Sequence, residues 1–143
     1  MDDNGKYGVL IVDDEKSNLE VLISILAEEY TVYMTKNGST AIEMANKYLP
    51  DIILLDIIMP DMNGFDVLAA LKASEKTRNI PVIIITGLDN VEDEERGFDL
   101  GAADFIHKPF SVKIVKAKVQ KQIQFETLAK ACQQLQKEEL NGG

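Results

Sequence analysis

Three short apolar runs, each followed directly by a polar side chain, constrain the fold of this chain more than any other feature. The runs and the residues that follow them are 9–12 with Asp13, 52–55 with Asp56, and 82–85 with Thr86. Runs of this length, rich in valine and isoleucine, are typical of strands buried on both faces of a parallel sheet. Since ligand sites of open α/β sheets lie at the carboxyl edge, the three polar residues are expected to meet there.

Strand and helix patterns alternate along most of the chain. We expect strands near 7–12, 31–35, 51–55, 81–85 and 104–107, and helices near 16–28, 38–48, 64–73, 91–100 and from 111 onward. Five βα units with short connections predict right-handed crossovers and an α/β fold with helices on both faces of the sheet. The alternating segment 31–35 is expected at a sheet edge.

Asp13, Asp14 and Asp56 would bring three carboxylates into one cleft. Such a cluster is costly unless a cation offsets the repulsion. Carboxylate oxygens are ligands of hard divalent cations, so Mg²⁺, with Mn²⁺ as a substitute, is the expected metal. A zinc site is disfavoured, because the chain has a single histidine, His107, and a single cysteine, Cys132.

Lys108 and Thr86 supply a positive charge and a hydroxyl donor to the same edge. With a metal ion they could hold the three oxygens of a phosphoryl group, where negative charge sits during transfer. A carboxylate can then act as the nucleophile, and Asp56, on the strand that is central in sequence, is the expected one.

The acidic composition bounds the partners of the chain. Of its 143 residues, 1–110 hold 9 Lys and Arg against 21 Asp and Glu, whereas 111–143 hold 6 against 3, for a net charge of −9 overall. An acidic body argues against direct binding to nucleic acid. No apolar run approaches the roughly 18 residues that would span a membrane, and the N-terminus is acidic where a secretory signal would be basic. We therefore expect a cytoplasmic protein.

The chain resembles the receiver domains of two-component response regulators between about residues 7 and 122. The resemblance rests on Val9–Glu15 (VLIVDDE), Asp51–Gly64 (DIILLDIIMPDMNG), Ile83–Gly87 (IIITG) and Gly101–Phe110 (GAADFIHKPF). It implies a flavodoxin-like fold with five parallel strands in the order 2-1-3-4-5. It also implies a switch module and not an enzyme with an external substrate.

The resemblance assigns a role to each site residue. Asp56 is implied to take a phosphoryl group from the phosphohistidine of a sensor histidine kinase or phosphotransfer protein. Asp14 and Asp56 are implied to bind Mg²⁺ directly, Asp13 through a water, and Ile58 through its backbone carbonyl. Lys108 is implied to contact the phosphoryl group and to precede a cis proline.

Further positions are implied to transmit and time the signal. Thr86 is expected to draw toward the phosphoryl group and to make room for the switch aromatic Phe105. Ile58 and Leu88 are expected to tune the phosphoryl lifetime, and their apolar side chains predict slow self-dephosphorylation. The resemblance puts the partner surface on residues 91–124.

Two other functions remain open at this stage. An aspartyl-nucleophile, Mg²⁺-dependent phosphohydrolase would use similar groups, but that class carries a second acid two residues after the nucleophile, where Ile58 stands. A pseudo-receiver that binds partners without phosphorylation is the other alternative, and the complete set of site residues argues against it.

The chain is expected to divide into a receiver domain, 6–124, and a helical tail, 125–143. Val112, Val115, Val119 and Ile123 form the expected core stripe of the last helix. A second stripe follows with spacings of 3, 4 and 3: Phe125, Leu128, Cys132 and Leu135. Two heptads fall short of a convincing coiled coil. The tail is therefore read as a connector to an output domain or a dimer seam, or as a helix that folds back on the body.

Overall fold

The computed structural model describes residues 5–87 and 90–142 and contains five βα units. The strands are β1 (Gly8–Val12), β2 (Thr31–Thr35), β3 (Ile52–Asp56), β4 (Val82–Thr86) and β5 (Asp104–His107). The helices are α1 (Lys16–Leu26), α2 (Gly38–Tyr48), α3 (Gly64–Ala73), α4 (Val91–Asp99) and α5 (Val112–Gly142). The sequence therefore predicted the type and order of every element.

All four strand pairings are parallel, and the strand order is β2-β1-β3-β4-β5. This order confirms the flavodoxin-like fold that the resemblance implied. All five residues are buried in each of β1, β3 and β4, which matches their continuous apolar runs. The alternating strand β2 lies at the edge, as predicted.

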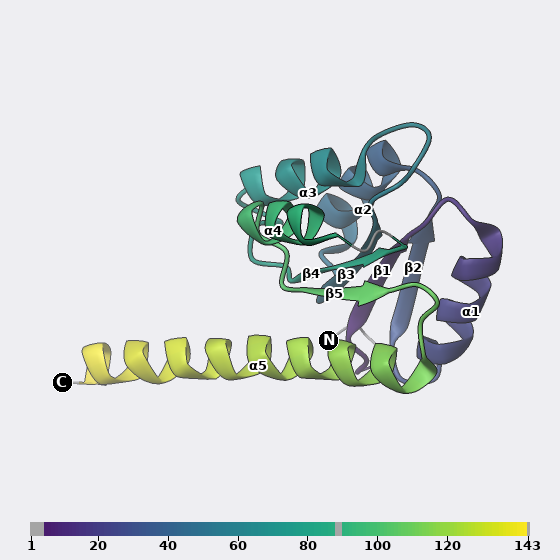
Figure 1. The fold of residues 1–143 in the computed structure, drawn as a ribbon. Coiled ribbons are helices and arrows are strands. Elements are labelled where there is room, and N and C mark those ends of the chain that lie inside the picture. The colour runs from purple at the N-terminus through teal and green to yellow at the C-terminus, as the bar shows by residue number, and fades with distance from the viewer. Residues whose placement is uncertain (1–4, 88–89, 143) are drawn as a thin grey trace.

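Helices α2 and α3 cover one face of the sheet and α1 and α5 the other (Figure 1), and a hydrophobic cluster lies on each face. On one face α2 and α3 contribute buried side chains such as Ala45, Leu68 and Leu71. On the other face α1 and α5 contribute Leu22, Val119 and others. Because strand side chains alternate between faces, each central strand feeds both clusters. The sheet is thus held rigidly, with its carboxyl edge open for a site.

Helix α4 buries fewer of its residues against the body than α1, α2 or α3 does. Of its nine residues, all described, only Gly97 is buried. Its sequence, VEDEERGFD, is mostly charged, so it offers little apolar surface to the body. Among the described residues, no helix has the length and apolar character needed to cross a membrane.

Helix α5 is one continuous helix that runs through the expected boundary at residues 124 and 125 and projects beyond the body (Figure 1). Val115, Val119 and Ile123 are buried, as predicted. The placement of Val112 in the core stripe was wrong, because its side chain is 53% exposed. Val112 is the first residue of the helix, and Phe110 packs against the cluster ahead of it. In this structure the tail does not fold back on the body.

Candidate phosphoryl-transfer site

The register of the sheet brings the acidic residues together. Val12 of β1 lies opposite Leu55 of β3. Asp13 and Asp56 are the next residues on each chain segment, so their carboxylates emerge side by side. One carboxylate oxygen from each of Asp13, Asp14 and Asp56 lies within 4.8 Å of the others. Asp13 and Asp56 are buried and Asp14 is half-buried.

Lys108 closes the cleft from the other side. Thr86 pairs with His107 across β4 and β5, so Lys108 follows at the same edge. Its backbone N–H donates to the carbonyl of Thr86 at 2.9 Å. Its Nζ lies 3.1 Å from Asp56 Oδ2 and 3.3 Å from Asp13 Oδ2. The Lys108–Pro109 peptide bond is cis, as the resemblance implied.

Burial is the largest single cause acting on the pKa of both Asp56 and Lys108. It raises the pKa of Asp56, against the hydrogen bonds that Asp56 accepts from Lys108 Nζ and the Ile58 N–H. The nearby charge of Asp13 raises it further. Burial lowers the pKa of Lys108, but the carboxylates of Asp56 and Asp13 outweigh it, and the net shift is upward. Lys108 is therefore held as a cation between two carboxylates.

The cleft retains an uncompensated acceptor. Asp13 Oδ2 is buried and accepts no well-oriented hydrogen bond from the described residues, although Lys108 Nζ is within ion-pair distance. Asp13 Oδ1 accepts from the Glu15 N–H at 2.9 Å, which fixes the carboxylate. Three carboxylates face one ammonium group. This donor set fits a hard divalent cation, which prefers carboxylate oxygens.

The loop after Asp56 is held by contacts that the sequence analysis missed. The Gly64 N–H donates to the carbonyl of Ile57 at 2.7 Å, and a Cβ at Gly64 would overlap the backbone of Asp56 and Ile57. Asn63 caps α3 through its side chain. Asp61 accepts from the Gly38 N–H at 3.0 Å and so ties the loop to α2. The sequence analysis used Asn63 and Gly64 only as the end of the motif Asp51–Gly64.

The predicted switch residues lie on adjacent strands beside the cleft. Thr86 ends β4 and is 1% exposed, and Phe105 in β5 is 4% exposed. The Phe105 ring packs beneath α4, where a Cβ at Gly97 would overlap it. Phe98 packs on the outer side, with ring centroids 5.0 Å apart. The glycine in α4 therefore makes room for the ring.

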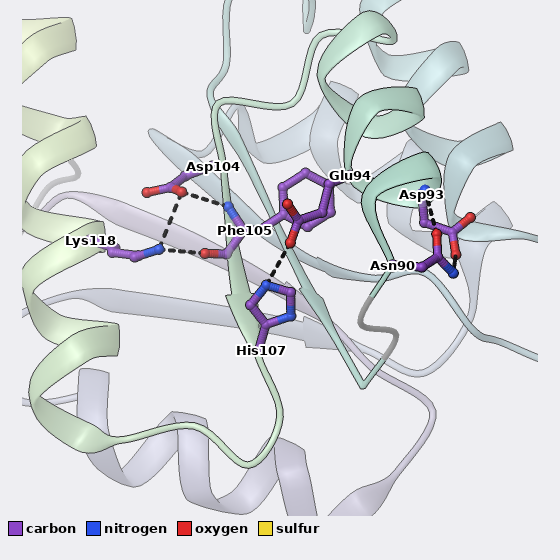
Figure 2. Close-up of polar contacts among 7 residues, drawn as sticks. All are labelled: Asn90, Asp93, Glu94, Asp104, Phe105, His107 and Lys118. Carbon is purple, nitrogen blue, oxygen red and sulfur yellow. Dashed lines mark hydrogen bonds and ion pairs between the residues drawn. The ribbon is translucent and has the colours of Figure 1, made fainter.

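Polar contacts fix β5 from both sides (Figure 2). From α5, Lys118 Nζ donates to the Phe105 carbonyl at 2.6 Å and to Asp104 Oδ1 at 3.2 Å. From α4, Glu94 Oε1 lies 2.8 Å from His107 Nε2. The sequence analysis missed both contacts, because no spacing rule links residues so far apart in the chain. His107 lies on the strand predicted at 104–107, and its side chain is partly exposed.

Of the two positions expected to tune the phosphoryl lifetime, only Ile58 lies among the described residues. Ile58 follows Asp56 by two residues, and its side chain is 58% exposed at the mouth of the cleft. Leu88 lies outside the described residues. The structure thus brings Asp13, Asp14, Asp56 and Lys108 into one cleft, and it sets Thr86 and Phe105 on the two strands next to it.

Comparison with known proteins agrees with this geometry. The family model of the response regulator receiver domain matches residues 9–120. A "Probable cyclic di-GMP phosphodiesterase" of Vibrio cholerae is 40% identical over 124 residues, covering 87% of this chain and 28% of the relative. The response regulator PleD of Caulobacter vibrioides is 43% identical over 119 residues, covering 82% and 26%. The chain thus spans little more than a quarter of each relative.

A solved structure adds a metal to the comparison. The receiver domain of sensor histidine kinase PA1611 from Pseudomonas aeruginosa, which has a magnesium ion coordinated in its active-site cleft, matches with a TM-score of 0.78 and 26% identity. The match covers 84% of this chain and 99% of that one. Members of this family are signalling switches. The matched sequence, the strand order and the acidic cleft together show that the chain belongs to the response regulator receiver domain family.

Proposed function

We propose that this chain accepts a phosphoryl group on Asp56 from the phosphohistidine of a sensor histidine kinase or phosphotransfer protein, in a Mg²⁺-dependent reaction. The observation that carries the proposal is the buried Asp56 carboxylate paired with Lys108 in a cleft that holds two further carboxylates. A carboxylate acts as a nucleophile when its neighbours offset the charge of the incoming group. The cleft supplies both the nucleophilic carboxylate of Asp56 and, in Lys108, a neighbouring positive charge.

In the transfer, an Asp56 carboxylate oxygen forms a bond to phosphorus while the phosphorus–nitrogen bond of the donor breaks. The electron pair of that bond returns to the imidazole, and the product on this chain is an acyl phosphate. Lys108 Nζ, already 3.1 Å from Asp56 Oδ2, is placed to hold a phosphoryl oxygen. The Ile58 N–H, which donates to Asp56 Oδ1 at 3.1 Å, orients the carboxylate.

Asp14 and Asp56 would hold Mg²⁺ or Mn²⁺ directly, with Asp13 acting through a water and Ile58 through its carbonyl. The unsatisfied Asp13 Oδ2 and the close carboxylates support this assignment, as does the magnesium ion in the PA1611 receiver. When bound, the ion neutralises charge on the phosphoryl oxygens. The protein residues position the acceptor carboxylate.

Thr86 and Phe105 would convert phosphorylation into a change of shape. The Thr86 hydroxyl would turn toward the phosphoryl group and leave space for the Phe105 ring. The partner surface would be residues 91–124, where apolar side chains such as Val91 and Phe98 are at least half exposed. An output domain or a separate protein would read that surface.

The acyl phosphate is expected to be long-lived. Ile58, exposed at the cleft, and Leu88 cannot hydrogen-bond an attacking water. Ile58→Asn should therefore shorten the half-life of the phosphorylated chain. A half-life of only seconds in the wild type would contradict this expectation.

The decisive experiment exposes the chain to a small phosphoryl donor and Mg²⁺ and measures hydroxylamine-labile phosphate by mass spectrometry. The wild type should be labelled, and Asp56→Asn should not. Beryllofluoride with Mg²⁺ should bind the wild type alone. Equal labelling or binding by both chains would refute the site.

The same assay separates the phosphohydrolase alternative. A phosphohydrolase would release many equivalents of inorganic phosphate from an excess of phosphate ester, whereas a switch would stop near one phosphoryl group per chain. The absence of an acidic side chain at position 58 favours the switch.

A further inference from the structure

The far half of α5 carries an uncovered stripe that ends in opposite charges. Its apolar positions are Phe125, Leu128, Cys132 and Leu135, and the three large side chains among them are 57–62% exposed. Lys121 lies four residues before Phe125. Glu139 lies four residues after Leu135, and both charged residues are exposed.

This stripe points mainly away from the body. Successive residues of an α-helix turn by about 100°, so the stripe lies roughly opposite the buried positions Val119 and Ile123. On the body side, Thr127 contacts the hydroxyl of Tyr7 at 3.4 Å. Figure 1 shows α5 as a straight helix whose far half stands clear of the other elements. At its near end the stripe borders the body, where Phe125 shares a pocket with Pro81 and Leu128 shares one with Tyr7. The large side chains of the stripe nevertheless stay more than half exposed within the described chain.

The residue spacing along the stripe is symmetric about its midpoint. From Lys121 to Glu139 the steps are 4, 3, 4, 3 and 4 residues. An identical helix laid antiparallel therefore meets it position for position, with Phe125 opposite Leu135 and Leu128 opposite Cys132. Each of these layers combines a larger side chain with a smaller one, which favours close packing. A two-fold interface of this kind is self-complementary.

The charges select the antiparallel orientation. In that arrangement Lys121 of each copy lies opposite Glu139 of the other, so an ion pair closes both ends. In a parallel pair each charge would face its own kind, which is destabilising. Beside the stripe, Glu138 is acidic, whereas Gln124, Ala129, Ala131 and Gln136 are uncharged. These four uncharged side chains add no repulsion between identical helices, and they lack the charges by which coiled coils choose a different partner.

We propose that two copies of this chain associate through antiparallel α5 helices, along the stripe from Lys121 to Glu139. The inference goes beyond phosphorylation and does not depend on it. Because the apolar part spans only two heptads, the dimer is weak and depends on concentration. The interface keeps the two receiver bodies on opposite sides of the helix pair, with both clefts free.

Sedimentation equilibrium of the full chain tests the apolar contact. Leu135→Glu should abolish the dimer. Its neighbour Gln134→Glu introduces the same side chain about 100° around the helix and should leave the dimer intact. Far-ultraviolet circular dichroism should show equal folding of both variants. A wild type that stays monomeric at every concentration, or a loss of dimer with Gln134→Glu alone, would overturn the proposal.

Charge reversal tests the orientation. Lys121→Glu and Glu139→Lys should each weaken the dimer about tenfold, and the two together should restore it, because exposed ion pairs contribute up to about 1 kcal/mol each. A parallel dimer keeps like charges opposed in every variant and shows no such rescue. A dimer that responds to Leu135→Glu but not to the reversals would therefore overturn the antiparallel arrangement.

Discussion

At the scale of single residues, Asp56 is a carboxylic acid whose side chain is buried. Burial raises its pKa in the folded chain. A group with a raised folded-state pKa stabilises the fold while it is protonated, and that contribution is lost as pH rises through the folded pKa. At neutral pH the ionised carboxylate therefore costs folding free energy, even with Lys108 beside it.

Asp56→Asn should consequently stabilise the metal-free protein at pH 7 by on the order of 1 kcal/mol. The advantage should shrink as pH falls toward the folded-state pKa, because the wild-type carboxyl then takes up its proton. Thermal unfolding in the presence of a chelator, measured from pH 7 down to pH 4, gives both quantities.

The surface residue Asp104 provides the control. Its carboxylate is paired with Lys118 at 3.2 Å and accepts the Phe105 N–H. Asp104→Asn should leave stability unchanged or lower it slightly, with no gain at pH 7. An Asp56→Asn variant that is less stable than the wild type at pH 7 would contradict the assignment of burial as the dominant cause.

Residue type and position relative to a strand were enough to predict the chemistry of the cleft. Asp13, Asp56 and Thr86 each stand at the end of an apolar run, Lys108 follows the last predicted strand, 104–107, and parallel strands end together at one edge of the sheet. The supporting contacts could not be predicted in the same way. The bond from the Gly38 N–H to Asp61 joins the first residue of α2 to a loop residue 23 positions later, and only the folded chain brings them together.

At the scale of elements, the contact between α4 and β5 depends on a missing side chain. Gly97→Ala would place a Cβ against the Phe105 ring and 2.9 Å from Ile84 Cδ1. Overpacking of this kind should destabilise the chain by about 1–3 kcal/mol in urea unfolding. Phe105→Leu in the same chain should recover part of the loss, and no recovery would exclude the ring as the cause.

Gly87→Ala is the matched control. Among the described residues, a Cβ at position 87 would meet no atom within 4 Å. The substitution should change stability by no more than about 0.5 kcal/mol. An equal loss at both positions would contradict packing against the Phe105 ring as the cause of the Gly97 effect.

Helix α4 should be the first helix to open locally. It buries only Gly97, whereas α3 buries five residues. Amide hydrogen exchange should therefore show lower protection in α4 than in α3. Glu94→Ala removes the contact to His107 and should speed α4 exchange by about two- to fivefold, since both side chains are partly exposed.

The exposed Glu92, also in the first turn of α4, controls for the loss of a negative charge at the helix start. Glu92→Ala should affect α4 exchange less than Glu94→Ala. Equal acceleration by both substitutions would assign the effect to the helix dipole.

Helix periodicity predicted which face of α5 is buried but not where burial begins. Val112 has the spacing of the core stripe, yet the body first covers the helix at Val115. Periodicity reports a direction around the axis. It holds no information on how far along the axis the neighbouring surface extends.

At the scale of the whole molecule, the expected division at residues 124 and 125 can be tested by truncation. A chain that ends at Gln124 keeps Val115, Val119 and Ile123, which are the buried residues among the described side chains of α5. It loses the exposed contact between Tyr7 and Thr127. The loss in unfolding free energy should be about 1 kcal/mol or less, measured by thermal or urea unfolding. An insoluble or unfolded product would move the boundary into the tail.

The backbone of α4 at Gly97 rests directly on the Phe105 ring, and in the proposed switch this ring also responds to Asp56. Binding of a partner at α4 and phosphorylation of Asp56 are then linked, and this linkage acts equally in both directions. A partner that prefers the phosphorylated chain by some factor must favour phosphorylation of Asp56 by the same factor. The phosphorylated fraction of this protein would then report the concentration of its partner as well as the activity of its kinase.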